Sequence, residues 1–91
     1  MKKKKKELYW LSFADETGLL GECFVEESDF LSAIRKTHKL GINPGGQVAW
    51  FGFEDGMESK ITPELKDRLI KKPELMALFP GVYKVRPGEL H

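Results

Sequence analysis

The sequence predicts an α+β fold: a three-stranded sheet, one long helix across it and two short C-terminal helices. Three observations lead to this prediction. Residues 8–27 alternate in polarity and contain a central turn, which is typical of a β-hairpin. Residues 28–41 have the spacing and ends of an amphipathic helix. After a turn rich in glycine, the chain becomes apolar again over residues 47–54.

The hairpin is predicted from strands at residues 8–14 and 19–25, joined by a turn in which Gly18 adopts a positive φ. Both faces of the first strand carry large apolar side chains, so we expect it to be the central strand. In the second strand one face is apolar and the other is half polar, which is typical of an edge strand. The two predicted faces are Leu19, Gly21, Cys23 and Val25 against Leu20, Glu22, Phe24 and Glu26.

The helix is predicted to begin at an N-cap on Ser28 and to end before Gly41, which fits the left-handed position after a helix. Ile42 is placed to fold back on the last turn, and Pro44 prevents continuation. Helical spacing assigns one face to Phe30, Leu31, Ala33, Ile34, Thr37 and His38, and the opposite face to Ser32, Arg35, Lys36 and Lys39.

Residues 48–53 are the third predicted strand. A right-handed crossover through the helix makes this strand parallel to the second. If the crossover passes over the doubly apolar first strand, the order in the sheet is second–first–third.

Past a polar loop, Thr62 and Pro63 predict a short helix through Ile70, and Pro73 starts another that ends at Phe79. We expect their apolar residues to cover the sheet face that the long helix leaves bare: Leu65, Leu69, Ile70, Leu75, Met76, Leu78 and Phe79. The chain therefore divides into a basic arm (1–7), one domain (8–81) and a tail (82–91).

Composition is that of a globular domain, with 41% hydrophobic and 32% charged residues. The single cysteine leaves no intramolecular disulfide and suits a reducing compartment. No apolar run is long enough to span a bilayer. These features favour a cytoplasmic location.

The lysine arm is the strongest local charge feature. It comprises Lys2, Lys3, Lys4, Lys5 and Lys6, while the rest of the chain holds ten basic and fourteen acidic residues. One interpretation is a solvated tail that raises solubility. The other is a set of phosphate contacts to nucleic acid, because lysine runs gain affinity by releasing counterions.

Candidates for catalysis or metal binding are weak. A Cys23–His38 pair shows no third orienting residue, and two histidines with one cysteine do not form a metal-ligand set. The glycines of residues 41–46 follow a helix, whereas a phosphate loop precedes one. Two groups of acidic residues have structural explanations. The start of the helix accounts for Glu26, Glu27 and Asp29, and an exposed loop accounts for Glu54, Asp55 and Glu58. We predict no enzyme activity, cofactor or metal.

Aromatic side chains are the best functional lead. The predicted partner-binding residues are Trp10, Trp50, Phe51 and Phe53, with Tyr9 and Phe13 beside them. Either the C-terminal helices bury this surplus, or a patch stays exposed for a partner or a second copy. Trp10 and Trp50 fall on adjacent strands in the expected order, which would let them lie side by side on one face.

Several segments resemble a family of short bacterial and phage proteins without an assigned activity. They are Trp10-Leu11-Ser12-Phe13-Ala14-Asp15, Gly18-Leu19-Leu20-Gly21, Ser32-Ala33-Ile34, Gly41-Ile42-Asn43-Pro44-Gly45-Gly46-Gln47-Val48 and Asp67-Arg68-Leu69-Ile70. The last is similar to the family's Asn-Arg-Leu-Leu, and the resemblance covers roughly residues 8–75. It implies a compact accessory protein of a phage or mobile element, with a host or defence component as target, and no ligand or catalytic residue.

The expected function is therefore that of a small non-enzymatic interaction protein. It would bind a protein partner, or itself as a homodimer, through an aromatic sheet surface. The alternative is nucleic-acid or nucleotide binding by the lysine arm with aromatic stacking.

Overall fold

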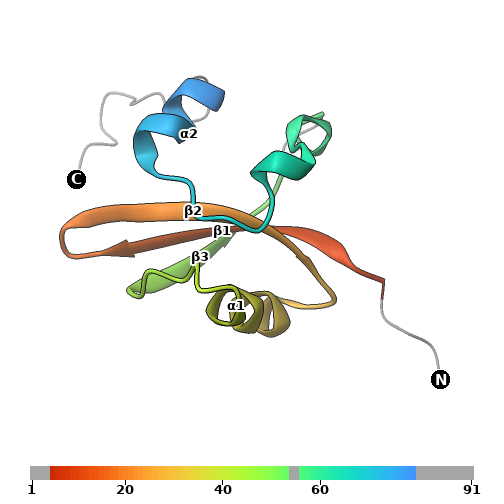
Figure 1. Cartoon of the computed structure of the whole chain (residues 1–91), viewed down its shortest axis with the longest axis horizontal. Coiled ribbons are helices and arrows are strands. Elements are labelled where there is room, and N and C mark those ends of the chain that lie inside the picture. The colour runs from red at the N-terminus through yellow and green to blue at the C-terminus, as the bar shows by residue number, and fades with distance from the viewer. Residues whose placement is uncertain (1–4, 54–55, 80–91) are drawn as a thin grey trace.

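The computed structural model describes residues 5–53 and 56–79. Its elements are β1 (Glu7–Asp15), β2 (Gly18–Glu27), α1 (Phe30–Lys39), β3 (Gln47–Phe51) and α2 (Lys72–Leu78), with two short 3₁₀ turns at Glu58–Lys60 and Pro63–Leu65. Figure 1 shows a central sheet with α1 on one side and the C-terminal turns and α2 on the other.

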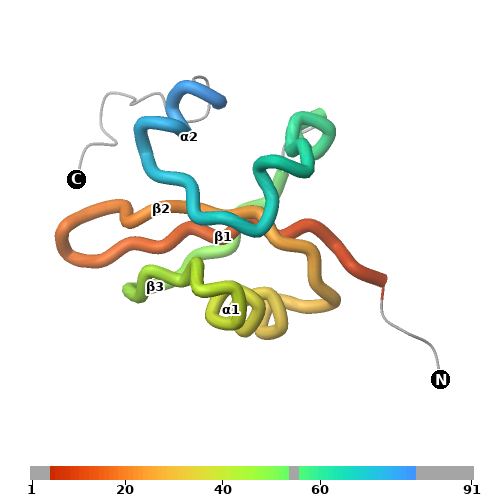
Figure 2. The backbone as a smooth tube through the Cα atoms, in the orientation of Figure 1, coloured from red at the N-terminus to blue at the C-terminus, as the bar shows by residue number. Residues whose placement is uncertain are grey.

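The sheet confirms the predicted topology. Its order is β2–β1–β3, and β1 pairs antiparallel with both neighbours. The path of the chain in Figure 2 therefore runs through α1 from one edge of the sheet to the other. Because β1 is central, side chains on both its faces are buried, including Trp10 and Leu11 on successive positions.

Two apolar clusters lie on the two faces of the sheet. The cluster beneath α1 consists of Tyr9, Leu11, Phe13, Cys23, Val25 and Ala33. The cluster on the C-terminal side consists of Trp10, Phe24, Met57, Ile61, Leu65, Ile70, Leu75 and Phe79. The C-terminal residues thus cover the face that α1 leaves bare, as predicted. Three of the predicted set differ: Leu69 packs against the cluster beneath α1, and Met76 and Leu78 are exposed.

A β-bulge changes the predicted faces of β2. Phe13 pairs with Gly21 and Ala14 with Leu19, so Leu20 is the extra residue. The inserted residue reverses the alternation: Leu19 packs with the C-terminal cluster and Leu20 with the α1 cluster. The predicted faces are therefore wrong for these two leucines and correct for Cys23 and Phe24.

Helix α1 begins one residue later than predicted. Asp29, not Ser28, is the N-cap, and its Oδ1 accepts a hydrogen bond from the Ser32 amide at 2.7 Å. The C-terminal end is confirmed: Gly41 has φ +72°, and the amides of Gly41 and Ile42 donate to His38 and Thr37 carbonyls.

The predicted apolar face of α1 is only partly buried. Ala33 and Thr37 are buried, but Leu31 is 62% exposed and His38 is also exposed. The helix is turned so that Lys36 faces β2, where its Nζ donates to the Glu26 carbonyl at 3.3 Å. On the other side, Phe30 faces β3.

The predicted helix from Thr62 to Ile70 is wrong. After the 3₁₀ turn the chain lies against the outer edge of β2 through isolated bridges at Lys66 and Ile70, with a turn between them in which Asp67 has φ +63°. The Glu22 amide donates to the Ile70 carbonyl at 2.8 Å, and the Ile70 amide donates back at 2.7 Å. Backbone hydrogen bonds along the edge of β2 replace those of the expected helix.

Arg68 connects the segment at residues 66–70 to α2. Its guanidinium donates to both carboxylate oxygens of Glu74, at 3.1 and 2.6 Å, and its Nε donates to the Glu64 carbonyl at 2.9 Å. The hydrogen bond from Arg68 holds the pKa of Glu74 below its usual value. Because the pair is exposed, its main effect is to fix the direction in which α2 leaves the edge of the sheet.

Candidate interaction surface

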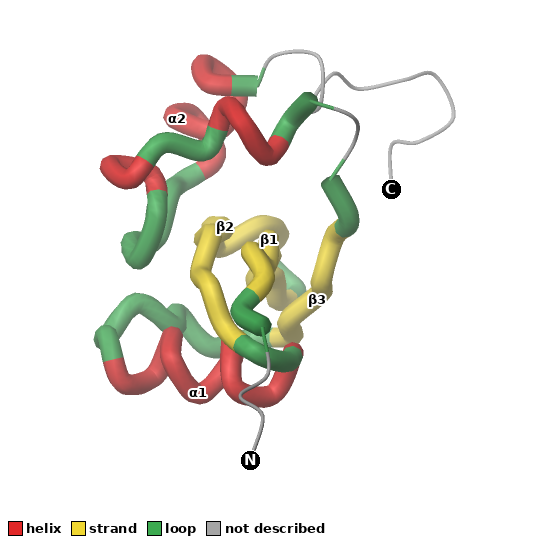
Figure 3. The backbone as a smooth tube through the Cα atoms, turned by 90° about the vertical axis from the view of Figure 1, so that its right-hand side faces the viewer, coloured by secondary structure: helices red, strands yellow, loops and turns green. Residues whose placement is uncertain are grey.

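The two edges of the sheet differ in their environment. The outer edge of β2 is covered by residues 66–70. Strand β3 pairs only with β1 among the described residues, and its pattern of exposure is that of a surface strand. Figure 3 shows β3 at the outer side of the sheet, between the layers of α1 and α2. The side chains and backbone of β3 therefore form the open edge.

Trp50 lies on the α1 face of this edge. It pairs with Leu11, its indole stacks on Phe30 with ring centroids 5.3 Å apart and planes 15° apart, and it contacts Tyr9 at 5.0 Å. Even so, 54% of Trp50 is exposed. One ring face is held by aromatic neighbours and the remainder is free to contact a partner.

Phe51 lies on the opposite face of the same edge. It pairs with Trp10, and the two rings meet edge to face at a centroid distance of 5.2 Å. The side chain of Phe51 is 41% exposed. The open edge thus presents one large aromatic group on each face of the sheet.

The remaining two predicted binding residues lie inward. Trp10 is 4% exposed, and its Nε1 donates to Glu22 Oε1 at 2.6 Å. Phe53 is half-buried beside Trp10 and Phe24, at centroid distances of 5.7 and 6.1 Å. Trp10 and Trp50 occupy opposite faces, so the prediction that they lie side by side is wrong. Their strands are neighbours, but Trp10 pairs with Phe51 and Trp50 pairs with Leu11, so the two indoles project from opposite faces of the sheet.

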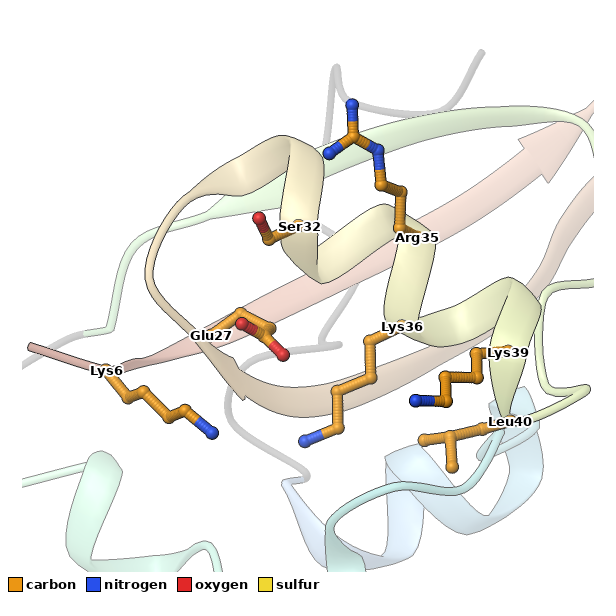
Figure 4. Close-up of a pocket in the computed structure, with 7 residues that line it drawn as sticks. All are labelled: Lys6, Glu27, Ser32, Arg35, Lys36, Lys39 and Leu40. Carbon is orange, nitrogen blue, oxygen red and sulfur yellow. The ribbon is translucent and has the colours of Figure 1, made fainter. Parts of the chain in front are cut away.

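A second surface feature lies on the other side of α1. It is a shallow groove of about 470 Å³, lined by Lys6, Glu27, Ser32, Arg35, Lys36, Lys39 and Leu40. Figure 4 shows these side chains. The ammonium groups of Lys6, Lys36 and Lys39 lie on the same side of the helix as Glu27, whereas the Arg35 guanidinium points away. Lys36 is also 3.6 Å from Asp67 Oδ1. The groove therefore combines the end of the lysine arm with basic residues of α1.

Only part of the lysine arm can be placed. Lys2, Lys3 and Lys4 lie outside the described residues, while Lys5 and Lys6 are exposed and precede β1. The sequence assigns Arg35, Lys36 and Lys39 to the face of the helix opposite its apolar residues. The sequence does not predict that these residues lie near Lys6, because their proximity depends on how α1 packs on β2.

The loop from Gly41 to Gly46 uses its polar groups internally. Besides the two capping amides, the Gly45 amide donates to Asn43 Oδ1 at 2.8 Å, and Asn43 Nδ2 donates to Thr37 Oγ1 at 2.9 Å. The loop is a helix cap followed by an Asx turn. These donors are not directed at an external anion.

Cys23 and His38 do not share an environment. Cys23 is fully buried in the α1 cluster, and burial raises the pKa of its thiol to about 12. His38 is exposed, with Nε2 3.3 Å from Asn43 Nδ2. Within residues 5–53 and 56–79, no three His, Cys, Asp or Glu side chains gather as metal ligands.

The buried thiol makes stability depend on pH. The unfolded thiol ionises near its ordinary pKa of 9.0, while the folded thiol stays neutral until about 12. Its stabilising contribution is therefore complete below pH 9.0 and is lost as the pH rises toward 12. Between about pH 8 and about pH 10.5, we expect wild type to lose about 2 kcal/mol more unfolding free energy than Cys23→Ala, measured in urea. Equal losses in both proteins would contradict the burial of an ionisable thiol.

The described helices are all too short to cross a membrane; α1, the longest of them, has ten residues.

Two residues of the first acidic group have structural roles. Asp29 caps α1, and a Glu26 carboxylate oxygen lies 3.5 Å from Lys66 Nζ. Of the other acidic group, Glu54 and Asp55 lie outside the described residues, as does the predicted tail at 82–91.

The structure therefore offers two surfaces, an aromatic sheet edge and a basic groove. They are separated by α1, because Phe30 contacts Trp50 on one side and Lys36 contacts Glu26 on the other. Comparison with protein-family models, curated protein sequences and solved structures finds no match to this chain.

Proposed function

We propose that this chain is a small interaction protein that recognises a protein through the open edge of β3. The observation that supports this most directly is the exposure of Trp50 and Phe51 on a strand whose outer edge pairs with none of the described residues. Tryptophan and tyrosine residues, when held rigid by neighbours, contribute strongly to binding. Trp50 meets this condition because Phe30 and Tyr9 hold its indole from within the domain.

Backbone hydrogen bonding supports the same surface. A partner strand that adds to an open sheet edge gains main-chain hydrogen bonds, and alternate side chains give specificity. Strand β3 offers five residues for such pairing, with aromatic groups at two adjacent positions. An interaction of this kind accords with the role that the resemblance to phage and mobile-element accessory proteins implies.

The test compares two substitutions that each place a lysine at an exposed apolar position. Trp50→Lys places a charge on the open edge, and Met76→Lys does the same on α2, where Met76 is 45% exposed. Immobilised wild type, Trp50→Lys and Met76→Lys are each presented with lysate and with a second, tagged copy of the chain. We expect at least one retained protein to be lost with Trp50→Lys and kept with Met76→Lys. Retention that is unaffected by Trp50→Lys would overturn the proposal.

A second candidate function is polyanion binding in the basic groove. Lys6 lies with Lys36 and Lys39 around one groove, so the last lysine of the arm and two lysines of α1 contribute charge to the same surface. Phosphate backbones bind such surfaces through counterion release. Because Trp50 lies on the far side of α1, stacking by this residue is not part of the groove.

The groove is tested with single-stranded DNA of uniform sequence. Lys39→Glu changes the groove, while Lys60→Glu makes the same charge change in the 3₁₀ turn at Glu58–Lys60. We expect Lys39→Glu to weaken binding about tenfold more than Lys60→Glu, and affinity to fall steeply with salt. Removal of residues 1–6 should weaken binding further. An affinity that changes neither with salt concentration nor with Lys39→Glu would exclude this function.

A further inference from the structure

In the part of the chain that the structure describes, the open edge has no charged side chain, proline, bulge or covering segment to prevent strand pairing. Edge strands in natural proteins are commonly protected by charged side chains, proline, a bulge or a covering segment. Residues 66–70 give β2 such a cover. Strand β3 reads Gln-Val-Ala-Trp-Phe, without charge or proline, and it pairs with β1 in continuous register. Within residues 5–53 and 56–79, one edge of the sheet is therefore covered and the other is not.

We infer that a second copy of this chain occupies the open edge, with the two β3 strands antiparallel about a two-fold axis at Ala49. This inference rests on the proposed function and names its partner. A symmetric pair uses the same patch on both subunits, so the patch must be complementary to itself. An uncharged strand meets this requirement, because antiparallel pairing brings no like charges together.

The register follows from the length of the strand. Strand β3 runs from Gln47 to Phe51, so centring the pair on Ala49 gives all five residues a partner, and any shift leaves some unpaired. In this register Val48 lies opposite Trp50 of the second copy, and Gln47 lies opposite its Phe51. Val48 packs with the α1 cluster and Trp50 lies on the same face. Each indole would therefore extend the apolar layer beneath α1 of the other copy.

The exposed area predicts the strength of the association. The uncovered parts of Trp50 and Phe51 together amount to roughly 200 Å² in each copy. Even with the strand backbones added, the contact stays below about 1,200 Å² in total, the range of transient complexes. The pair should therefore be reversible, with a dissociation constant in the micromolar range or weaker.

Charge at the two-fold axis gives the sharpest test. Ala49 is exposed, and in the proposed register it lies opposite itself. Ala49→Lys and Ala49→Glu each place like charges directly across the axis, whereas a mixture of the two variants places opposite charges there. Met76→Lys is the matched control, and circular dichroism establishes that each variant is folded.

Sedimentation of the full chain between about 10 μM and about 1 mM gives the readout. We expect the average mass of wild type and Met76→Lys to rise from 10.4 kDa toward twice that value. Each Ala49 variant alone should stay at 10.4 kDa, and their mixture should regain the association. A wild type that stays at 10.4 kDa, or Ala49 variants that associate like wild type, would overturn the inference. If a different protein is captured in a Trp50-dependent way while the wild type stays monomeric, the inference fails and the proposed function stands.

Discussion

Replacing Gly21 by alanine is expected to lower the unfolding free energy by about 2–4 kcal/mol. Gly21 has φ +151°, and a Cβ atom there would lie 2.8 Å from Leu69 Cδ1 and 3.1 Å from the Ile70 carbonyl oxygen. The side chain of Leu69 has some freedom to move, but the Ile70 carbonyl accepts the Glu22 amide and is fixed. The substitution should therefore push the covering segment off β2. Urea unfolding followed by circular dichroism measures the loss.

Gly18 is the matched control for this prediction. It also has a positive φ, +118°, but a Cβ atom there would meet nothing within 4 Å. Gly18→Ala therefore reports backbone strain alone, and we expect it to cost about 1–2 kcal/mol less than Gly21→Ala. Equal losses at the two positions would show that residues 66–70 do not press on the edge of β2.

Replacing Trp10 by phenylalanine is expected to cost about 2–4 kcal/mol. The substitution removes the indole Nε1 donor from Glu22 Oε1 and reduces the ring that Phe24, Phe51 and Phe53 surround. Glu22 is 2% exposed, so its carboxylate cannot recover this hydrogen bond from bulk water without opening the core. Thermal and urea unfolding should both show the loss.

A double-mutant cycle isolates the hydrogen bond from the loss of packing. Glu22→Leu leaves the buried indole donor without this acceptor, whereas Trp10→Phe with Glu22→Leu removes both groups. Because replacing both partners by apolar groups avoids an unmatched polar atom, the double variant should be at least about 1 kcal/mol more stable than the sum of the single losses predicts. Additive losses would mean that the 2.6 Å contact contributes little to stability.

The sequence predicts the sheet and α1 because local patterns and packing agree there. An alternating hairpin rich in aromatic residues, a capped helix and a glycine after that helix each favour the observed structure on their own. The segment from Thr62 to Ile70 carries an N-cap and proline typical of a helix start. Its backbone instead pairs with β2, an interaction between distant residues that local spacing does not reveal. The bulge at Leu20 is missed for the same reason, since it depends on the register of two strands.

The sequence predicts which aromatic residues gather near the candidate site, but not which of them are exposed. The four aromatic residues Trp10, Trp50, Phe51 and Phe53 do gather at β1 and β3, yet only Trp50 and Phe51 are exposed. Glu22 offered a usable signal, because a carboxylate within an apolar strand requires a buried donor. Trp10 is that donor; its indole is buried on the central strand β1, whereas Trp50 is exposed on the edge strand β3.

The two tryptophans allow the most direct test of recognition at the β3 edge. Each gives one indole N–H signal in a ¹⁵N–¹H correlation spectrum, and the two can be assigned by substitution. As the concentration rises, or as a captured partner is added, the Trp50 signal should shift while the Trp10 signal, held by Glu22, stays in place. A Trp50 signal that stays unchanged under both conditions would contradict recognition through this edge.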